Sequence, residues 1–263
     1  MKVVITEIPR WIFRGDSILL ASLGLFCIAW FSGQSLKVPA GRWRQLLGMA
    51  SCNIVGWNMF AIYGVSLLPS GRAAILGYTM PIWSALLSVW FLDERLTRRR
   101  VAGLVLGMGG MALLIGAEFE KLGSAPVGVL LMLVAAIFWA GGLIIYKRDP
   151  LPMPISSLTA WQALLGGIPI ALSGHALEHV EWSQVGFWPM FGFWYNVFIG
   201  LLFCYWAWNK LVQMVPAAVS SLGSLIVPVV GVFSGILFLG EVPRWQDFAA
   251  LALVLTAIAT VLL

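Results

Sequence analysis

The chain has 263 residues, of which 60% are apolar and only 10% carry a charge, and its mean hydropathy is +0.93. Soluble domains carry about 25% charged residues, so a water-soluble globular protein is excluded. The formal net charge of +5 comes from basic residues in the loops between apolar segments. We therefore expect an integral membrane protein with no nucleic-acid partner.

In chain order, the sequence contains continuous apolar runs close to the ~20 residues that a helix needs to cross a bilayer. The runs do not alternate between apolar and polar residues, as the strands of a membrane barrel would. The sequence therefore predicts an all-α integral membrane protein. The nine expected spans are roughly 17–33, 46–68, 73–92, 101–117, 128–146, 156–173, 190–212, 216–239 and 247–263.

Basic residues are distributed unequally between the two sets of alternate loops. Ten lie on one side, among them the segment RLTRRR at 95–100, and six lie on the other side together with the N-terminus. The positive-inside rule assigns the richer side to the cytoplasm. With nine spans, we expect a protein of the cell (inner) membrane with its C-terminus in the cytoplasm and its N-terminus outside.

A shift of 147 residues aligns the first half of the chain with the second. Pro81 then falls on Pro228, and Glu94 on Glu241. Equivalent spans are five apart, and because five is odd the second copy has the opposite orientation in the membrane. The sequence therefore predicts two inverted repeats of five helices, an architecture typical of transporters. The first repeat would occupy residues 1–117 and the second residues 128–263.

The first of these repeats is shorter than the second by one span. Only four of the nine spans fall within it, so its first helix is missing from the sequence. The opening segment MKVVITEIPRWIFRGD corresponds to the end of a span and the loop after it, as in IIYKRDPLPMPISSLTAWQ of the second repeat. We expect a tenth span to be encoded upstream of Met1.

Pro81 and Pro228 interrupt apolar runs in which a helix interior would lose about 3 kcal/mol to a proline. Each frees the carbonyl four residues earlier, which then needs another partner or a water-filled cavity. Broken helices in inverted-repeat transporters lie beside the substrate site, so we expect the two prolines to have a structural role in shaping the cavity or a role in its gating. The alternative is a proline kink that a membrane helix simply tolerates. Glu94 and Glu241 end the same segments, where we expect contacts with nearby arginines.

These features resemble the EamA-type transporters of the drug/metabolite transporter superfamily. The resemblance rests on the two inverted halves, on the proline and glutamate pattern that closes the fourth span of each half, and on FWAGGLIIYKR at 138–148. That segment is similar to the opening span of such a half. The resemblance implies a ten-helix inner-membrane carrier, with both termini cytoplasmic, that exports amino acids, related metabolites or drugs. The absent first span departs from this pattern.

Several large and polar side chains lie at mid-depth in the predicted spans, away from the surfaces where an aromatic belt would be found. A mid-depth tryptophan is either core filler or a cavity wall, and polar side chains in a span tend to face the bundle interior or a cavity. For serines, helix packing is the alternative. We expect a midplane cavity with the candidate substrate-binding residues Asn53, Trp57, Tyr78, Trp83, Trp139, Asn196, Tyr205 and Ser221.

None of the predicted spans holds an Asp, Glu, Lys, Arg or His well inside its apolar core. A cavity without fixed charge suits a neutral, zwitterionic or aromatic solute, although mid-depth indoles could also stack on a cation. The sequence therefore predicts an exporter of small metabolites, foremost amino acids, that works by alternating access. The alternatives are a multidrug exporter of cationic drugs and an accessory or flippase-like subunit.

A membrane-embedded enzyme is the least favoured function, because the spans contain no convergent catalytic groups. His175 and His179 in HALEH have the spacing of a metal half-site, but we expect them in a solvated outer loop with no further ligand. No metal and no cofactor are therefore expected. The expected partners are a small-molecule solute and the lipid bilayer, and a homodimer is left open.

Overall fold

The computed structural model describes residues 4–68, 73, 76–94, 97–119, 126–216, 220, 230 and 245–262. Throughout this part of the chain the secondary structure is helical, and it contains no β-strand. Five of its helical segments are long and apolar enough to span a bilayer, and Met80–Leu92 forms a shorter apolar helix. The predicted all-α, multi-pass membrane protein is therefore confirmed.

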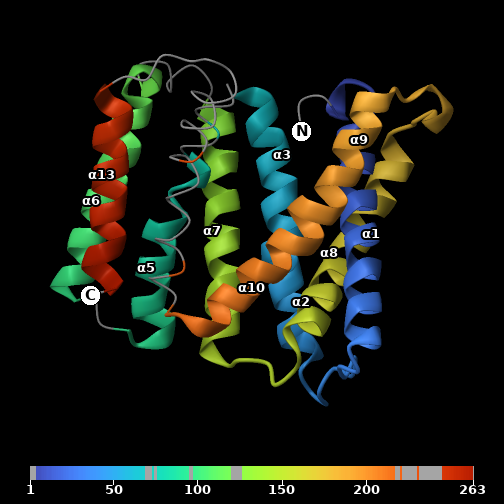
Figure 1. Ribbon diagram of the computed structural model, residues 1–263, viewed down its shortest axis with the longest axis horizontal. Helices are drawn as coiled ribbons and strands as arrows, with labels where there is room; N and C mark the ends of the chain where they lie inside the picture. Colours follow the sequence, from blue (N-terminus) through green and yellow to red (C-terminus); the bar gives the residue numbers. More distant parts are fainter. Residues whose placement is uncertain are drawn as a thin grey trace. The chain divides into compact units, whose positions relative to one another are not determined.

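The five segments are α1 (Arg10–Phe31), α2–η2–α3 (Trp43–Ala50, Ser51–Gly56, Trp57–Leu67), α7 (Pro126–Arg148), α8 (Ile155–Leu177) and α9–η5–α10 (Phe187–Tyr195, Asn196–Phe203, Cys204–Met214) (Figure 1). The other elements are η1 (Val4–Thr6), α5 (Met80–Leu92), α6 (Arg98–Phe119), η4 (Trp182–Gln184) and α13 (Trp245–Leu262). The segments η2 and η5 are π-helical, a rare form that occurs mostly as single wide turns within α-helices, frequently at functional sites.

Helix α1 begins at Arg10, seven residues before the expected span 17–33. The hydropathy pattern excluded these residues because Arg14 and Asp16 lower the local average. In the folded chain Asp16 Oδ1 lies 2.9 Å from His175 Nε2, so its carboxylate has a partner at the end of α8. Arg14 and Asp16 therefore belong to a membrane-length helix rather than to the loop before it.

The start of α1 is capped by a residue that is distant in the sequence. Glu178, the residue that follows α8, accepts hydrogen bonds from the backbone N–H groups of Trp11 and Ile12 at 2.9 and 3.1 Å. The first N–H groups of a helix have no intrahelical partner and carry partial positive charge. The carboxylate of Glu178 satisfies two of them and fixes the end of α8 to the start of α1.

The chain forms two compact units. Unit 1 comprises Met1–Met59 and Ile145–Met214, and unit 2 comprises Phe60–Ile144 and Val215–Leu263. Each unit takes helices from both predicted repeats, so the units do not coincide with the sequence halves 1–117 and 128–263. The repeat boundaries remain a prediction about the sequence.

In unit 1, α1 and α8 lie side by side along most of their length (Figure 1). Glycines permit this approach: a Cβ atom on Gly15 would meet the backbone of Ala171, and one on Gly174 would lie 2.9 Å from Ile12 N. Ser22 Oγ adds a buried hydrogen bond of 2.8 Å across the seam to the carbonyl of Ala160. Small residues and single polar contacts of this kind are how helices associate in a bilayer.

Several element boundaries follow the 147-residue offset of the sequence repeat. Helices α3 (Trp57–Leu67) and α10 (Cys204–Met214) begin and end 147 residues apart. The π-helical segments before them end with the same offset, at Gly56 and Phe203. In unit 2, the first residues of α6 and α13, Arg98 and Trp245, are also 147 residues apart.

In unit 2, α6 packs along α13 (Figure 1). A second contact joins α7 to the end of α3, where Leu68 and Met132 belong to one buried cluster. The rings of Phe60 and Phe138 stack in the same region, with centroids 5.3 Å apart. These contacts are apolar, as expected of helices held together by packing within a bilayer.

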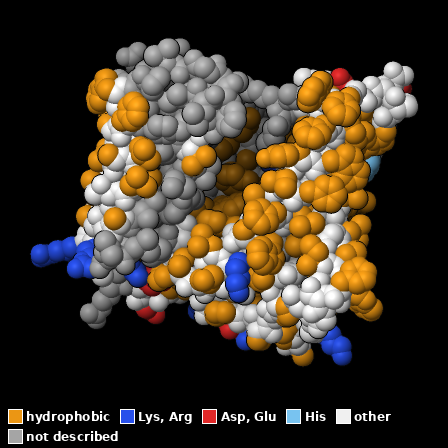
Figure 2. Space-filling view, viewed as in Figure 1, with side chains coloured by type: hydrophobic (Ala, Val, Ile, Leu, Met, Phe, Trp, Pro, Cys, Tyr) orange, Lys and Arg blue, Asp and Glu red, His pale blue; other side chains and the backbone are white. Residues whose placement is uncertain are grey.

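The outward surface of α9, η5 and α10 in unit 1 is covered by large apolar side chains (Figure 2). Soluble proteins rarely expose contiguous apolar patches of this kind. The surface is therefore suited to contact with lipid tails. Its exposed members include Phe187, Trp188, Phe191, Trp194, Phe198 and Phe203.

Candidate functional site

Arg14 lies on the buried face of α1. Ile18, Ala21, Leu25 and Ala29 are all buried, and a helical repeat of 3.6 residues extends the same face back to Arg14. Arg14 itself is only partly exposed. At about 1.5 Å per residue, it lies roughly 6 Å along the axis from the start of this 22-residue helix. A charged residue within a span is costly and therefore points to function.

Tyr205 of α10 connects Arg14 to a third polar side chain. It interacts electrostatically with Arg14 and forms a hydrogen bond with the side chain of Asn58. Asn58, the second residue of α3, is only 3% exposed, and its Nδ2 also donates to the carbonyl of Ile54 at 2.7 Å. We call Arg14, Asn58 and Tyr205 the Arg14 cluster. It unites a cation, an amide and a phenol from three helices within unit 1.

Two more side-chain hydrogen bonds join the spans of unit 1 to α8. Asn53 Nδ2 donates to Gln162 Oε1 at 3.2 Å, and Asn209 Nδ2 donates to Thr159 Oγ1 at 3.1 Å. Polar side chains often connect helices within a bilayer in this way. The predicted site residue Asn53 therefore makes a contact between helices from its position in the π-helical turn η2.

Unit 1 also contains buried polar atoms whose hydrogen-bonding capacity is unfilled. Among the residues that the structure describes, Gln162 Nε2, Asn196 Oδ1 and Ser17 Oγ have no hydrogen-bond partner. An unsatisfied buried polar group costs about 1–3 kcal/mol, so such groups are rare unless water or a ligand completes them. Asn196, a predicted site residue, is the first residue of the π-helical segment η5.

The gap beside Tyr205 is small. Ile54 and Leu201 are among the residues that line it, and its volume is about 10 Å³. That volume is at the lower limit for a single water molecule. The apolar gap beside Tyr205 therefore has room for one water molecule at most.

The predicted aromatic residues are divided between the two units. Trp57 is the first residue of α3 in unit 1, whereas Tyr78, Trp83 and Trp139 belong to unit 2. Trp83 Nε1 donates to Thr79 Oγ1 at 3.2 Å, so its indole N–H has a partner within its own helical turn. A cavity shared by these residues remains a prediction.

Pro81 lies in the first turn of α5, directly after a turn at Tyr78 and Thr79. The apolar run 73–92 is therefore not one uninterrupted helix. A proline is well tolerated at the start of a helix, because its missing N–H would lack an intrahelical partner there. Thr79 N instead donates to the carbonyl of Leu76 at 3.2 Å, which tightens the chain before the break.

Glu94, one of the two predicted loop glutamates, forms a salt bridge with Arg100 across 2.7 Å. This contact ties the end of α5 to the start of α6. Asp93, the residue directly after α5, adopts a left-handed backbone conformation with a φ of 53°, and this conformation ends the helix. The predicted residues Ser221, Pro228 and Glu241 lie outside the described part of the chain.

The expectation that the HALEH segment lies in a loop is wrong for its first residues, although these residues are exposed as expected. Helix α8 extends to Leu177, and His175 in its last turn pairs with Asp16. Within the described ranges, no group of three or more His, Cys, Asp or Glu side chains could hold a metal ion. The sequence analysis did not identify Arg14 as a candidate site residue. Counting back from Ile18 by one helical turn places Arg14 on the buried face, so helical periodicity could have identified it.

The model of the EamA-like transporter family matches residues 1–116 and 126–263, which together cover nearly all of the sequence. The chain belongs to the EamA-like transporter family. It is therefore a multi-pass membrane transporter, and its family and relatives indicate transport rather than enzymatic catalysis.

The transporter has relatives in several bacteria. The uncharacterized transporter YoaV of Bacillus subtilis is 28% identical over 245 residues, which are 92% of this chain and 83% of the relative. A probable amino-acid metabolite efflux pump of Salmonella typhimurium is 28% identical over 98% of this chain and 87% of its own length. A crystal structure matches 98% of this chain and 90% of its own with a TM-score of 0.84, and its 18% identity shows the shared fold alone.

Proposed function

We propose that this transporter exports amino acids or closely related zwitterionic metabolites across the cell (inner) membrane by alternating access around a midplane cavity. Its C-terminus would lie in the cytoplasm, as the distribution of basic residues indicates. The observation that carries the proposal is the Arg14 cluster, a cation joined to polar partners inside a membrane-spanning unit.

The chemistry of the Arg14 cluster suits a carboxylate. A guanidinium binds a carboxylate through two parallel hydrogen bonds, and charge-assisted hydrogen bonds of this kind are about twice as strong as neutral ones. Tyr205 and Asn58 offer a hydroxyl and an amide beside the guanidinium, and both groups can donate and accept. An amino acid presents a carboxylate together with ammonium donors, so it can satisfy both kinds of group.

The same cation disfavours the alternative of a cationic drug exporter. A fixed positive charge repels a cation over several ångströms in a medium of low dielectric constant. The predicted mid-depth tryptophans could bind the apolar part of an amphipathic solute. The name of the Salmonella typhimurium relative, a probable amino-acid metabolite efflux pump, supports the same class of solute.

The test is efflux from cells that express the chain together with any span encoded upstream. Cells would be loaded with labelled amino acids and, separately, with cationic dyes. We expect export of a subset of the amino acids, and we expect Arg14→Gln to reduce that export at least tenfold. Arg10→Gln is the matched control, because Arg10 is an exposed arginine one turn earlier on the same helix.

The outcomes separate the competing functions. Amino-acid export that Arg14→Gln abolishes and Arg10→Gln preserves would support the proposal. Export of the dyes alone, or equal export by wild type and Arg14→Gln, would contradict it. No export by a chain shown to be inserted and folded would favour the accessory subunit.

A further inference from the structure

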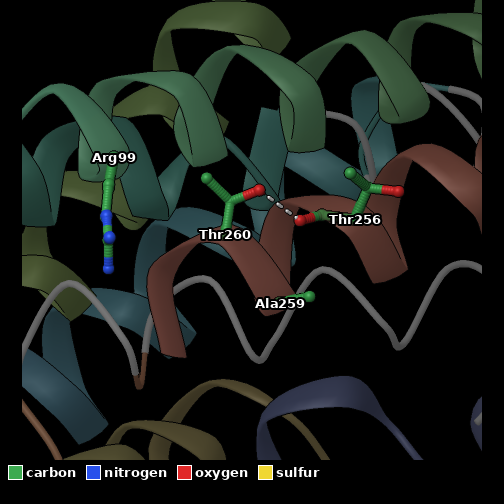
Figure 3. A pocket seen from close by; sticks show the side chains of 4 residues that line it. All are labelled: Arg99, Thr256, Ala259 and Thr260. Atoms are coloured by element: carbon green, nitrogen blue, oxygen red, sulfur yellow. Dashed lines mark hydrogen bonds between the residues drawn. The ribbon is translucent and has the colours of Figure 1, made fainter. Parts of the chain in front are cut away.

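The second unit contains an open pocket of its own. It is lined by Arg99 at the start of α6 and by Thr256, Ala259 and Thr260 near the end of α13, and its volume is about 330 Å³. Figure 3 shows Arg99 extending from α6 beside the two threonines of α13. Small-molecule pockets in proteins span about 300–1,000 Å³, so this one could hold a lipid headgroup.

The position of the pocket along the helices places it at a membrane surface. Arg99 is the second residue of α6, and Thr260 is two residues before the last residue of α13. Arg99 and Thr260 line the same pocket, so the start of α6 lies beside the end of α13. Residues 97–100 of the basic RLTRRR segment lie at this end, which is the expected cytoplasmic face.

The charge at this end favours an anionic ligand. Arg98, Arg99 and Arg100 follow one another at this end, and Arg98 and Arg99 are both exposed. Basic pockets between membrane-spanning helices on the cytoplasmic side bind the headgroups of anionic lipids. Arg99 lines the pocket and Arg98 does not, so the two arginines can be distinguished experimentally.

The threonines restrict the kind of anion. Thr256 Oγ1 donates its proton to the carbonyl of Ala252, and Thr260 Oγ1 donates its proton to the carbonyl of Thr256, each at 2.7 Å. A hydroxyl whose proton is used in this way can only accept from a ligand. A suitable headgroup must therefore combine a phosphate for Arg99 with hydrogen-bond donors for the threonines.

We propose that this pocket binds a phosphatidylglycerol molecule of the cytoplasmic leaflet. Arg99 contacts the phosphodiester, and the glycerol hydroxyls of the headgroup donate to Thr256 and Thr260. The acyl chains extend along the apolar surface of α13, where Leu255 is 48% exposed. Phosphatidate offers the anion without the glycerol, and phosphatidylcholine offers neither a net negative charge nor donors.

The proposal can be tested by native mass spectrometry of the purified full chain with added lipids. We expect phosphatidylglycerol to bind at least fivefold more tightly than phosphatidylcholine and more tightly than phosphatidate. Arg99→Gln should weaken phosphatidylglycerol binding about fivefold, the factor that corresponds to one arginine near an anionic surface. Arg98→Gln should change it less than twofold, and Arg99→Lys should retain most of it.

A Thr256→Val/Thr260→Val variant tests the headgroup assignment. It preserves side-chain shape, and it should remove the preference for phosphatidylglycerol over phosphatidate. The free headgroup, glycerophosphoglycerol, tests whether the ligand is a lipid or a soluble phosphodiester. At a concentration equal to that of the lipid, it should not displace the lipid.

Three results would overturn the proposal. The first is an equal loss of binding in Arg98→Gln and Arg99→Gln, which would indicate a diffuse charge effect. The second is an unchanged preference in the threonine variant. The third is competition by the free headgroup as strong as by the lipid, which would indicate a soluble ligand. None of these measurements depends on efflux, so they are independent of the proposed transport function.

Discussion

Asn58 and Tyr205, whose side chains hydrogen-bond inside unit 1, are 147 residues apart and therefore occupy the same position in the two copies of the sequence repeat. Ile54 and Leu201, which line the small gap beside Tyr205, have the same offset. Equivalent residues meet each other where a two-fold axis relates two copies. This contact therefore lies where an axis relating the two repeats would pass.

Removing the phenol hydroxyl at this contact should impair transport. Tyr205→Phe deletes the partner of Asn58 and the group beside Arg14 while keeping the ring in its apolar surroundings. We expect efflux to fall about tenfold, whereas the free energy of unfolding should fall by only about 1 kcal/mol. Tyr195→Phe is the control, because Tyr195 is 58% exposed on α9. Equal efflux by the two variants would contradict a role for the hydroxyl.

Trp57 precedes Asn58 at the start of α3, directly after the π-helical turn. Trp57→Ala removes a large, partly exposed indole, and we expect efflux to fall severalfold with little change in the amount of protein in the membrane. Trp90→Ala, at a site 74% exposed near the end of α5, should leave efflux unchanged. Normal efflux by Trp57→Ala would remove this residue from the candidate site.

Pro81 is expected to influence the rate of transport more than binding. Pro81→Ala restores an N–H that can donate to the carbonyl of Gly77 and join α5 to the helical turn before it. We expect the maximal efflux rate to fall about fivefold with little change in the half-saturating solute concentration. Pro169→Ala serves as the control, since Pro169 lies inside the uninterrupted helix α8. A change in the half-saturating concentration alone would show that the break serves binding instead.

The close approach of α1 and α8 should be intolerant of a single methyl group. Gly174→Ala brings a Cβ atom to 2.9 Å from Ile12 N, which belongs to rigid backbone. We expect a cost of about 1–3 kcal/mol, observed as a melting temperature lowered by several degrees in detergent. Gly109→Ala in α6 meets nothing within 4 Å and should instead stabilise its helix by up to about 1 kcal/mol. Equal melting temperatures for the two variants would show that the seam can relax.

The cap supplied by Glu178 should also be measurable. Glu178→Ala leaves the N–H groups of Trp11 and Ile12 without their acceptor, and we expect a loss of about 1–2 kcal/mol in the free energy of unfolding. Glu178→Gln keeps an acceptor and should lose less. The exposed Glu181 provides the control as Glu181→Ala. A melting temperature unchanged in Glu178→Ala would mean that water replaces the carboxylate.

The apolar runs predicted the spans of the described part of the chain well, because a bilayer requires each backbone polar group to be satisfied within its own helix. The helix ends were predicted less well. Arg14 and Asp16 shortened the first predicted span, yet both have partners that lie far along the chain. Local hydropathy carries no information about such partners, so the cap by Glu178 and the pairing of His175 could not be anticipated.

The candidate site was predicted only in part. Tyr205 and Asn53 were identified because polar residues in spans tend to face inward. Asn58 was not among the predicted site residues, because a regular α-helix places it on a different face from Asn53 and Trp57. The π-helical turn at Ser51–Gly56 breaks that regular spacing, and no simple sequence pattern predicts such a turn.

The two π-helical turns also bear on the history of the molecule. A wide turn holds one residue more than an α-helical turn, so each one records an insertion relative to a regular helix. The turns end at Gly56 and Phe203, equivalent positions of the two copies. One insertion in an ancestral half, made before that half was duplicated, accounts for both turns. Two later insertions would have to coincide at equivalent residues, so a single insertion before the duplication is the simpler explanation.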